Sequence, residues 1–177
     1  FGLAISADGE YIAAGSFDDD GNDDKVYLFD KDSSTPLWSY STGGSAGVYK
    51  VSISADGEYM VAGSGASSSN NIYLFKPKDS DEYVWTYGVE GSQVRSVAIS
   101  ANGEYIAAGT VAQSSGKDNA VHLFGRDNNT PIWIHDFGND IDVRSIAMSE
   151  DGNYIFVGTS NQVAHLFART SSTPLWT

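Results

Sequence analysis

Four copies of one short pattern divide the chain into repeats. Aspartate or asparagine, glycine, a polar residue and tyrosine follow one another in each copy, and the four tyrosines lie 48, 46 and 49 residues apart. Each copy is followed by an apolar segment that ends in Leu-Phe, and then by a tryptophan. Self-similarity at a period of about 20 to 50 residues indicates an array of like structural units. The tyrosines are Tyr11, Tyr59, Tyr105 and Tyr154, and the tryptophans are Trp38, Trp85, Trp133 and Trp176.

Within each repeat the apolar residues are spaced as in short strands. In 94–100 valine and isoleucine alternate with smaller or polar residues, and the Asn-Gly that follows predicts a hairpin with a type I′ turn. A second strand runs through 11–16, a third through 26–29, and a fourth carries Trp38, with counterparts in the other repeats. No window keeps a 3.6-residue amphipathic period, so we expect no helices.

Four antiparallel strands in about 43 to 49 residues are typical of one blade of a β-propeller. We therefore expect an all-β chain of four four-stranded antiparallel blades, at approximately 1–43, 44–90, 91–139 and 140–177. Each blade buries both of its faces against its neighbours, so a single blade should not fold alone. The whole chain, 1–177, is then one partial propeller domain.

The chain resembles the WD-repeat and quinoprotein-like propeller superfamily over its whole length. Residues 28–38, Leu-Phe-Asp-Lys-Asp-Ser-Ser-Thr-Pro-Leu-Trp, are similar to the quinoprotein tryptophan-docking motif, with Pro36 where that motif has glycine. The Ala-Asp-Gly-Glu-Tyr hairpin is similar to that of WD-like surface propellers, although the Trp-Asp dipeptide is absent. The resemblance implies rings of seven or eight blades, with ligands bound on the face that carries the loops between second and third strands.

Four blades supply half of such a ring, so both end blades would expose an apolar face to water. Two arrangements cover those faces. Either two copies pair head to tail as a homodimer, or the chain is part of a longer polypeptide. The first inner strand lacks a counterpart of Val48, Val94 and Val143, which favours the longer polypeptide.

Comparison of the repeats separates constant segments from variable ones. The spacing from the hairpin tyrosine to the glycine that ends the second strand, as in Tyr11 to Gly15, is 4 in every repeat. From that glycine to the first residue of the third strand the spacing is 11, 9, 12 and 6. Freedom in length indicates exposed loops, so we expect the face with these loops to contact a partner.

One of these loops, 18–24, is rich in aspartate. Its oxygen-bearing side chains alternate with other residues, a spacing at which a curled loop can direct several oxygens to one hard cation such as Ca²⁺. The loop is not an EF-hand, because no helices flank it and no glutamate stands at its twelfth position. A solvated acidic loop explains the same residues equally well. The candidate metal ligands are Asp18, Asp20, Asn22 and Asp24.

A second group of candidates lies at the start of the innermost strands. Arg95 and Arg144 occupy equivalent positions, with Tyr49 in the second repeat and Phe1 in the first. Arginine can bind a partner carboxylate through two parallel hydrogen bonds, so Tyr49, Arg95 and Arg144 are candidate partner-binding residues. Alternatively the arginines neutralise nearby acids of this chain. Those acids include Glu90, Asp140 and Asp142.

We expect the histidines and tryptophans to be structural. His122 and His165 stand in the third strands of separate blades, too far apart to share a metal, and His135 stands alone. We expect their ring nitrogens to be satisfied within the fold. The tryptophans recur once per blade, so we expect them to pack between blades with their indole N–H groups bound.

Composition narrows the function further. The chain has 23 acidic and 10 basic residues, a net charge of −13 and no cysteine. Such a charge disfavours nucleic acid and anionic membrane surfaces as partners, and the apolar stretches are far shorter than the ~20 residues of a membrane span. No nucleophile elbow or phosphate-binding loop is present. We therefore expect no enzyme and no cofactor other than the candidate Ca²⁺.

The sequence thus predicts a non-enzymatic propeller that recognises a protein or glycan through its variable-loop face, at a cell surface or in another extracytoplasmic space. The first alternative is a purely structural module of a larger surface protein. The second is a remnant quinoprotein-like redox enzyme.

Overall fold

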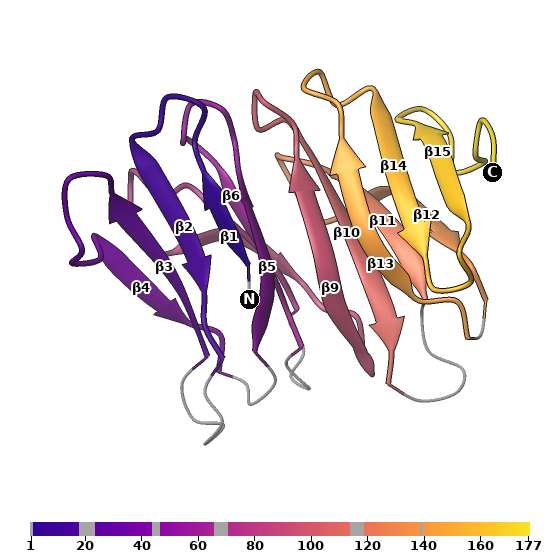
Figure 1. Cartoon of the computed structure of the whole chain (residues 1–177), viewed down its shortest axis with the longest axis horizontal. Coiled ribbons are helices and arrows are strands. Elements are labelled where there is room, and N and C mark those ends of the chain that lie inside the picture. The colour runs from indigo at the N-terminus through magenta and orange to yellow at the C-terminus, as the bar shows by residue number, and fades with distance from the viewer. Residues whose placement is uncertain (1, 18–23, 44–46, 66–70, 114–118, 139) are drawn as a thin grey trace.

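The structure, a computed structural model, describes the whole chain except residues 1, 18–23, 44–46, 66–70, 114–118 and 139. The described residues form fifteen β-strands and no helix, in four antiparallel sheets that we number blades 1 to 4 (Figure 1). The all-β architecture expected from the sequence is confirmed. Within this described part, no helix is long and apolar enough to cross a membrane.

Each blade runs from its inner to its outer strand in chain order. Blade 1 contains β1 (Leu3–Ile5), β2 (Tyr11–Gly15), β3 (Lys25–Asp30) and β4 (Trp38–Ser41). Blade 2 contains β5 (Val48–Ile53), β6 (Met60–Ser64), β7 (Ile72–Phe75) and β8 (Tyr83–Tyr87). Blade 3 contains β9 (Ser92–Ile99), β10 (Tyr105–Ala112), β11 (Ala120–Gly125) and β12 (Pro131–Asp136). Blade 4 contains β13 (Val143–Met148), β14 (Tyr154–Thr159) and β15 (Ala164–Ala168).

The blades stand side by side, and their first strands form a row. β1 contacts β5, β5 contacts β9, and β9 contacts β13. In Figure 1 the strands β5, β9 and β13 cross the front of the molecule next to one another. This row is the inner wall of the blade array.

The turn between the first and second strands has one geometry in all four blades. In blade 1 the Gly9 amide donates to the Ser6 carbonyl (2.9 Å), and Gly9 has a φ of 76°. Asp8 Oδ1 accepts from the Ser6 hydroxyl (2.5 Å) and from the Glu10 amide (3.1 Å). The aspartate keeps a negative φ, so this is a type I turn followed by a left-handed glycine. The type I′ turn predicted from Asp-Gly is wrong, because the serine hydroxyl and the aspartate carboxylate hold the tighter arrangement.

Successive blades are joined at these turns. The ring of Tyr59 lies against Gly103 of the next blade, where an added Cβ would be 2.6 Å from Cδ2 of the tyrosine. Arg126, also from the next blade, places its Cζ 4.9 Å from the centroid of the same ring. Tyr11 meets Gly57 and Lys78 in this way, and Tyr105 meets Gly152 and Arg169. The turn amides of Ala7, Ala55 and Ala101 donate to the carbonyls of Ala55, Ala101 and Glu150, each at 2.9 Å.

We call the interface between two successive blades a joint. A tryptophan of the earlier blade completes each joint. The indole Nε1 of Trp38 donates to the Pro77 carbonyl (2.9 Å), that of Trp85 to Arg126 (2.8 Å) and that of Trp133 to Arg169 (2.7 Å). The prediction of inter-blade tryptophans with bound indole groups is confirmed for these three. Trp176 is 51% exposed, since the described residues include no further blade beside it.

The hydrophobic core lies in the three joints. One apolar cluster fills each joint, and its members come from the facing sides of the two blades. In the joint between blades 1 and 2, for example, Ala13 and Val26 face Val51, Met60 and Phe75. Each joint is therefore a small sheet-on-sheet core of the kind that stabilises repeat arrays.

Blade 4 differs from the four strands expected of it. Its sheet has three strands, and Trp176 pairs with Leu166 only through an isolated bridge. In blades 1 to 3 the outer strand is also held by the tryptophan bond to the next blade. Blade 4 has no such neighbour within the described residues, so its outer segment makes fewer contacts.

Candidate functional site

The blades have two different ends. We call the end with the repeated turns the hairpin end, and the opposite end the loop end. At the loop end, the segments between second and third strands lie beside the connections from one blade to the next. The Thr42 amide donates to the Asp24 carbonyl (2.9 Å), and the Val48 amide to the Ser16 carbonyl (2.9 Å). The two kinds of loop therefore share one face, as the resemblance implied.

Three β-bulges at this end carry the predicted partner-binding residues. Val48 pairs with Ser64 and Lys50 with Gly63, which leaves Tyr49 as the extra residue. Arg95 is likewise skipped between Val94 and Ser96, and Arg144 between Val143 and Ser145. A bulge re-aims the side chain of its extra residue. We call Tyr49, Arg95 and Arg144 the bulge row.

The valine before each bulge residue explains why the bulge forms. Val48, Val94 and Val143 are fully buried. Each packs against the glycine that ends the second strand of the preceding blade. A Cβ on Gly15 would lie 2.6 Å from Cγ1 of Val48, and the same contact joins Gly63 to Val94 and Gly109 to Val143. With the valine turned into the joint, the next side chain points away from it.

Two members of the bulge row contact each other across a joint. The Arg95 guanidinium carbon lies 4.0 Å from the centroid of the Tyr49 ring, and Arg95 Nε donates to Gln93 Oε1 (2.8 Å). Stacking of this kind holds an arginine in place while its remaining donors face the solvent. Arg95 is exposed.

Arg144 is held differently. Its Nη2 lies 2.7 Å from Asp142 Oδ2, and its side chain is 60% exposed. The alternative of charge neutralisation therefore holds for Asp142. Among the described residues, neither arginine forms an ion pair with Glu90 or Asp140. Phe1, the counterpart in the first repeat, lies outside the described residues.

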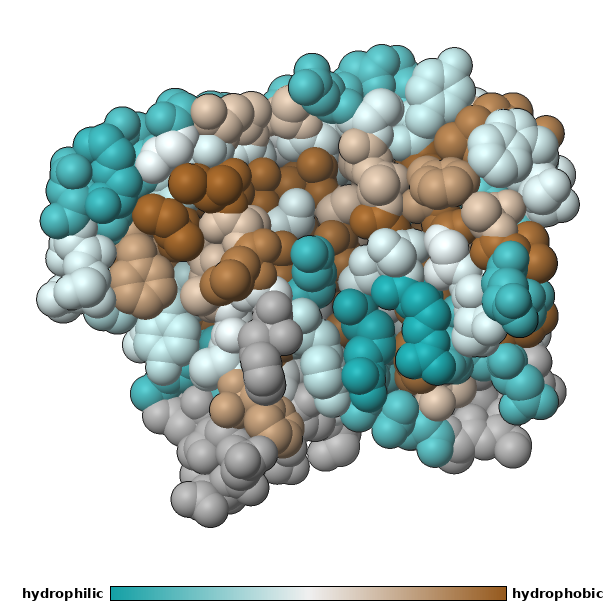
Figure 2. All heavy atoms as spheres, in the orientation of Figure 1, coloured by the Kyte–Doolittle hydropathy of each residue, from teal (hydrophilic) through white to brown (hydrophobic). Residues whose placement is uncertain are grey.

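Figure 2 shows the front of the molecule. Hydrophilic side chains gather in the lower middle of the front, over β9 and β13, whereas hydrophobic ones spread over β1 and β2 at the upper left. The bulges in β9 and β13 carry Arg95 and Arg144, two positive charges on a chain whose net charge is −13. Local positive groups in an acidic surface favour a partner that brings its own carboxylates.

The aspartate-rich loop falls largely outside the described residues, which exclude Asp18, Asp20 and Asn22. Asp24 is described and is buried. Its Oδ2 accepts from the Gly47 amide (2.6 Å) and its carbonyl from the Thr42 hydroxyl (3.1 Å). Asn119 connects Ala112 and Gly138 in blade 3 in a similar way. Asp24 therefore has a structural role, and cation binding stays a prediction for all four residues.

The histidines are less well satisfied than the sequence suggests. His122 is fully buried and His165 half-buried, and neither ring nitrogen of either has a hydrogen-bond partner within the described structure. Burial lowers the pKa of His122 to about 4, and burial followed by the nearby His135 lowers that of His165. Both rings pack against aromatic neighbours in the slot that holds Tyr73 in blade 2. The expectation of satisfied nitrogens is wrong for these two, while His135 Nδ1 lies 2.7 Å from the Ser172 carbonyl.

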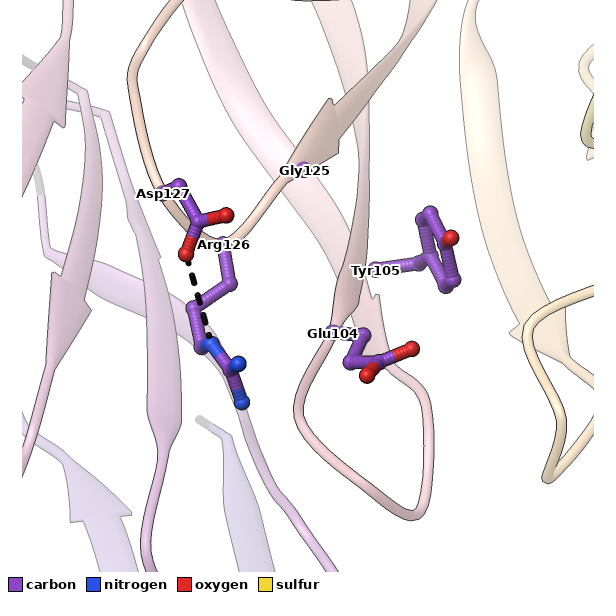
Figure 3. A pocket seen from close by; sticks show the side chains of 5 residues that line it. All are labelled: Glu104, Tyr105, Gly125, Arg126 and Asp127. Carbon is purple, nitrogen blue, oxygen red and sulfur yellow. Dashed lines mark ion pairs between the residues drawn. The ribbon is translucent and has the colours of Figure 1, made fainter.

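Small pockets at the hairpin end have a structural origin. One of about 260 Å³ is lined by Glu104, Tyr105, Gly125, Arg126 and Asp127 (Figure 3). In the view of Figure 3 the Arg126 side chain extends away from Tyr105, and the Asp127 carboxylate points to its Nε as an ion-pair partner. A pocket of about 190 Å³ recurs at the equivalent residues of blade 4. The pocket therefore belongs to the repeat itself, at the corner between the hairpin turn and the turn after the third strand. Within the described residues no group of three metal-ligating side chains occurs.

Comparisons with known proteins agree with this geometry. The family model "WD domain, G-beta repeat" matches residues 34–76 and 82–124. Each match begins just before or at the outer strand of one blade and ends at the third strand of the next, so it spans a joint. Two segments of the chain are therefore similar to the WD repeat. This supports the WD part of the expected resemblance and gives no support to the quinoprotein part.

Among solved structures, a chain of the "Crystal Structure of Mitotic Checkpoint Complex" is similar with a TM-score of 0.72 at 21% sequence identity. The match covers 96% of this chain and 50% of that chain. This chain thus spans half the length of the structural relative, which shows the fold alone. No curated protein matches the sequence.

Two features were not predicted from the sequence: the turn serine at the hairpin end and the bulges that carry the row at the loop end. The serine two residues before the aspartate or asparagine recurs in all four repeats, so its constant spacing was a usable signal. The bulges have no such signal, because an extra residue becomes visible only when two strands are placed in register.

Proposed function

We propose that this chain is a non-enzymatic interaction scaffold whose bulge row binds a carboxylate-bearing segment of a protein partner. The bulge row carries the proposal. Three equivalent bulges on the inner strands of adjacent blades place Tyr49, Arg95 and Arg144 at the loop end.

The chemistry of the row fits an acidic peptide. Arg95 keeps guanidinium donors free to meet a carboxylate, because it uses its Nε for Gln93 and its face for Tyr49. Arg144 forms an exposed ion pair with Asp142. Because such pairs are weak in water, a partner carboxylate can compete with Asp142 for the Arg144 guanidinium. Two guanidinium groups from neighbouring blades then offer bidentate contacts to carboxylates.

The row suits a protein better than a glycan. Sugar recognition commonly needs an open aromatic face for stacking, and the Arg95 guanidinium covers one face of Tyr49. The WD-type repeats and the solved relative, which is part of a checkpoint complex, support a protein partner in the same way. Neither identifies that partner.

The test uses a fluorescein-labelled peptide of ten alternating aspartates and glutamates with a free C-terminal carboxylate. Fluorescence anisotropy at low salt should show saturable binding to the wild-type chain, and Arg95→Glu combined with Arg144→Glu should weaken it at least tenfold. The matched control is Lys76→Glu, which reverses a charge at the hairpin end, where Lys76 pairs with Asp79.

If the double variant binds the peptide as tightly as the wild type, the bulge row is not the binding site and the proposal is wrong. A purely structural module, the main alternative, would show no saturable binding in any of the three proteins. Binding should weaken with added salt, since the proposed contacts are exposed.

A further inference from the structure

The residue two positions before each bulge residue differs from blade to blade. We call this place in the blade the flank position. It is occupied by Gly47 in blade 2, Gln93 in blade 3 and Asp142 in blade 4. The three are structurally equivalent, because the next residue in each blade is the buried valine that fixes the bulge. The flank position therefore places a different side chain beside each member of the bulge row.

In blade 3 the flank residue orients the arginine without cancelling its charge. Gln93 Oε1 accepts a hydrogen bond from Arg95 Nε (2.8 Å), and the guanidinium carbon lies 4.0 Å from the centroid of the Tyr49 ring. The amide of glutamine is neutral, so Arg95 keeps its full positive charge. Within the described residues Arg95 forms no ion pair, so both of its Nη groups can meet a partner carboxylate.

In blade 4 the flank residue is itself a carboxylate bound to the arginine. Asp142 Oδ2 lies 2.7 Å from Arg144 Nη2, and the aspartate side chain is 22% exposed against 60% for the arginine. Ser160 fixes the backbone of Asp142: its hydroxyl accepts from the Asp142 amide (2.9 Å), and its amide donates to the Asp142 carbonyl (2.9 Å). The carboxylate is therefore held in the place where a partner carboxylate would meet Arg144.

The connections that lead into the two bulges repeat this contrast. Residues 139–144 contain two acids and one arginine, whereas residues 90–95 contain one acid and one arginine. The second acid of blade 4, Asp140, stands where blade 3 has Gly91, and the two have φ values of 70° and 72°. Glycine adopts this left-handed backbone most readily, and aspartate is one of the few other residues that tolerate it. An incoming anion therefore meets more negative charge at Arg144 than at Arg95.

We propose that the flank position decides which arginine of the bulge row accepts a partner carboxylate: Arg95 is open, and Asp142 is an internal competitor at Arg144. This inference rests on the proposed function, because it assigns unequal roles to two arginines of the same site. A carboxylate that binds Arg144 has to displace Asp142, whereas one that binds Arg95 displaces no charge. The partner segment thus needs a carboxylate opposite Arg95, and an uncharged polar residue suffices opposite Arg144.

Exchange of the two flank residues tests the proposal with the acidic peptide and the anisotropy assay described above. Asp142→Gln copies blade 3 and should tighten binding about three- to fivefold, the effect expected from removal of an exposed ion pair that competes with the partner. Gln93→Asp copies blade 4 and should weaken binding by a similar factor. Urea unfolding of both variants checks that the blades stay folded.

A charge-matched control separates competition from total charge. Asp127→Gln also removes one negative charge and also takes an aspartate from an arginine, since Asp127 Oδ1 lies 3.7 Å from Arg126 Nε. This pair stands at the hairpin end, away from the bulge row, so the variant should bind the peptide as the wild type does. If Asp127→Gln tightens binding as much as Asp142→Gln, the gain comes from total charge and the inference is wrong.

A double-mutant cycle locates the effect at Arg144. The gain from Asp142→Gln should disappear when Arg144→Gln is also present, because the competitor then has nothing to release. In the wild type, Arg95→Gln should weaken binding about threefold more than Arg144→Gln does, and in the Asp142→Gln background the two losses should become equal. A gain that persists without Arg144 would contradict the proposal.

The outcomes distinguish this inference from the proposed function. If Arg95→Glu with Arg144→Glu weakens binding but the two flank exchanges do not change it, the bulge row binds the peptide and the inference alone is wrong. If no protein, Asp142→Gln included, binds the peptide saturably, both are wrong. Saturable binding that appears only in Asp142→Gln would support the inference, since it would show Asp142 blocking the site.

Discussion

The hairpin end of the blades repeats the same residues from blade to blade, whereas the loop end varies in length and sequence. At the hairpin end the same serine, glycine and tyrosine recur in every blade, and a chain of amide-to-carbonyl bonds of 2.9 Å runs from turn to turn. At the loop end the segments differ in length from blade to blade, and equivalent bulge positions carry tyrosine in one blade and arginine in two others. One end therefore holds the blades together, and the other is free to vary.

The difference shows how a repeat array can acquire a function without losing its fold. A residue that takes part in a joint is constrained by two blades at once, as Gly103 is by Tyr59. A bulge residue is constrained less, because the buried valine before it fills the joint and the contact of Arg95 with Tyr49 lies at an exposed side chain. Changes at the two ends should accordingly have very different costs.

The largest effect is expected from Gly103→Ala at the hairpin end. The new Cβ would lie 2.6 Å from Cδ2 of Tyr59, at a φ of 69°. The left-handed backbone costs about 1–2 kcal/mol and the overlap about 1–3 kcal/mol more. Urea unfolding should show a loss of about 3–4 kcal/mol. Gly43→Ala, with the same φ and no atom within 4 Å, should show the backbone part alone.

Equal losses at Gly103 and Gly43 would mean that the tyrosine moves aside freely. The joint would then be looser than its geometry suggests.

Acid should weaken the joint between blades 2 and 3 through His122. Its pKa is about 4 in the folded chain, below the ordinary 6.5, so the unfolded chain binds more protons between these values. Stability from this group is complete above pH 6.5 and is lost as pH falls toward 4, by on the order of 2 kcal/mol at pH 5. His122→Tyr follows the residue of blade 2 and should remove this share of the acid sensitivity. Unfolding free energies of both proteins at pH 7 and pH 5 give the answer, and an equal fall in both would refute it.

A smaller loss is expected from Ser100→Ala in the turn of blade 3. The Ser100 hydroxyl donates to Asn102 Oδ1 (2.8 Å) and accepts from the Tyr105 amide (3.0 Å). Without it the buried turn loses both bonds, at a cost of about 1–2 kcal/mol. Ser39→Ala, on an exposed part of β4, should stay within about 0.5 kcal/mol of the wild type. If Ser100→Ala costs no more stability than Ser39→Ala, the Ser100 hydroxyl does not stabilise the turn.

Calcium tests the loop end. If Asp18, Asp20, Asn22 and Asp24 bind Ca²⁺ in the range of extracellular sites, roughly 10⁻⁴ to 10⁻³ M, then 5 mM Ca²⁺ should stabilise the chain by about 1–2 kcal/mol. Asp18→Asn with Asp20→Asn should abolish the increment in melting temperature. Asp24 is unsuitable for this variant because its carboxylate bonds to the Gly47 amide. If Ca²⁺ raises the melting temperature of the variant by the same amount, the ion binds at other acidic residues.

The smallest effect on stability is expected in the bulge row. Arg95→Gln with Arg144→Gln removes an exposed stacking contact and an exposed ion pair. Contacts of this kind contribute up to about 1 kcal/mol each and often nothing measurable. Urea unfolding should place the variant within about 1 kcal/mol of the wild type. A loss of several kcal/mol would mean that the bulge row, like the turns, holds the blades together.

The framework was predictable because it recurs. Tyrosine, glycine and tryptophan at fixed spacings indicate the joints from the sequence alone, since each repeat has to meet its neighbour in the same way. The turn type was mistaken because the pair Asp-Gly suits more than one turn. The serine hydroxyl that selects the observed turn lies two residues before the aspartate.

The sequence predicted where the candidate site residues lie but not the bulges that expose them. Comparison of the repeats aligned Tyr49, Arg95 and Arg144, but the bulges that expose them depend on register between strands. The burial of Asp24 was not predicted, because sequence spacing carries no information on burial. His122 was expected to have a partner, yet it occupies a tyrosine slot whose surroundings are aromatic.

Native-state hydrogen exchange tests the contrast between the two ends most directly. The amides of Ala55 and Ala101 lie in exposed-looking turns but donate to the next blade, so we expect their opening free energies to approach that of global unfolding. Within the described part of the chain the Gly43 amide at the loop end bonds only to the Ser41 hydroxyl, at 3.4 Å, and should exchange by local fluctuation. If Ala55 and Ala101 exchange as fast as Gly43, the hairpin end does not hold the blades together, and the division of the molecule into a framework end and a recognition end is wrong.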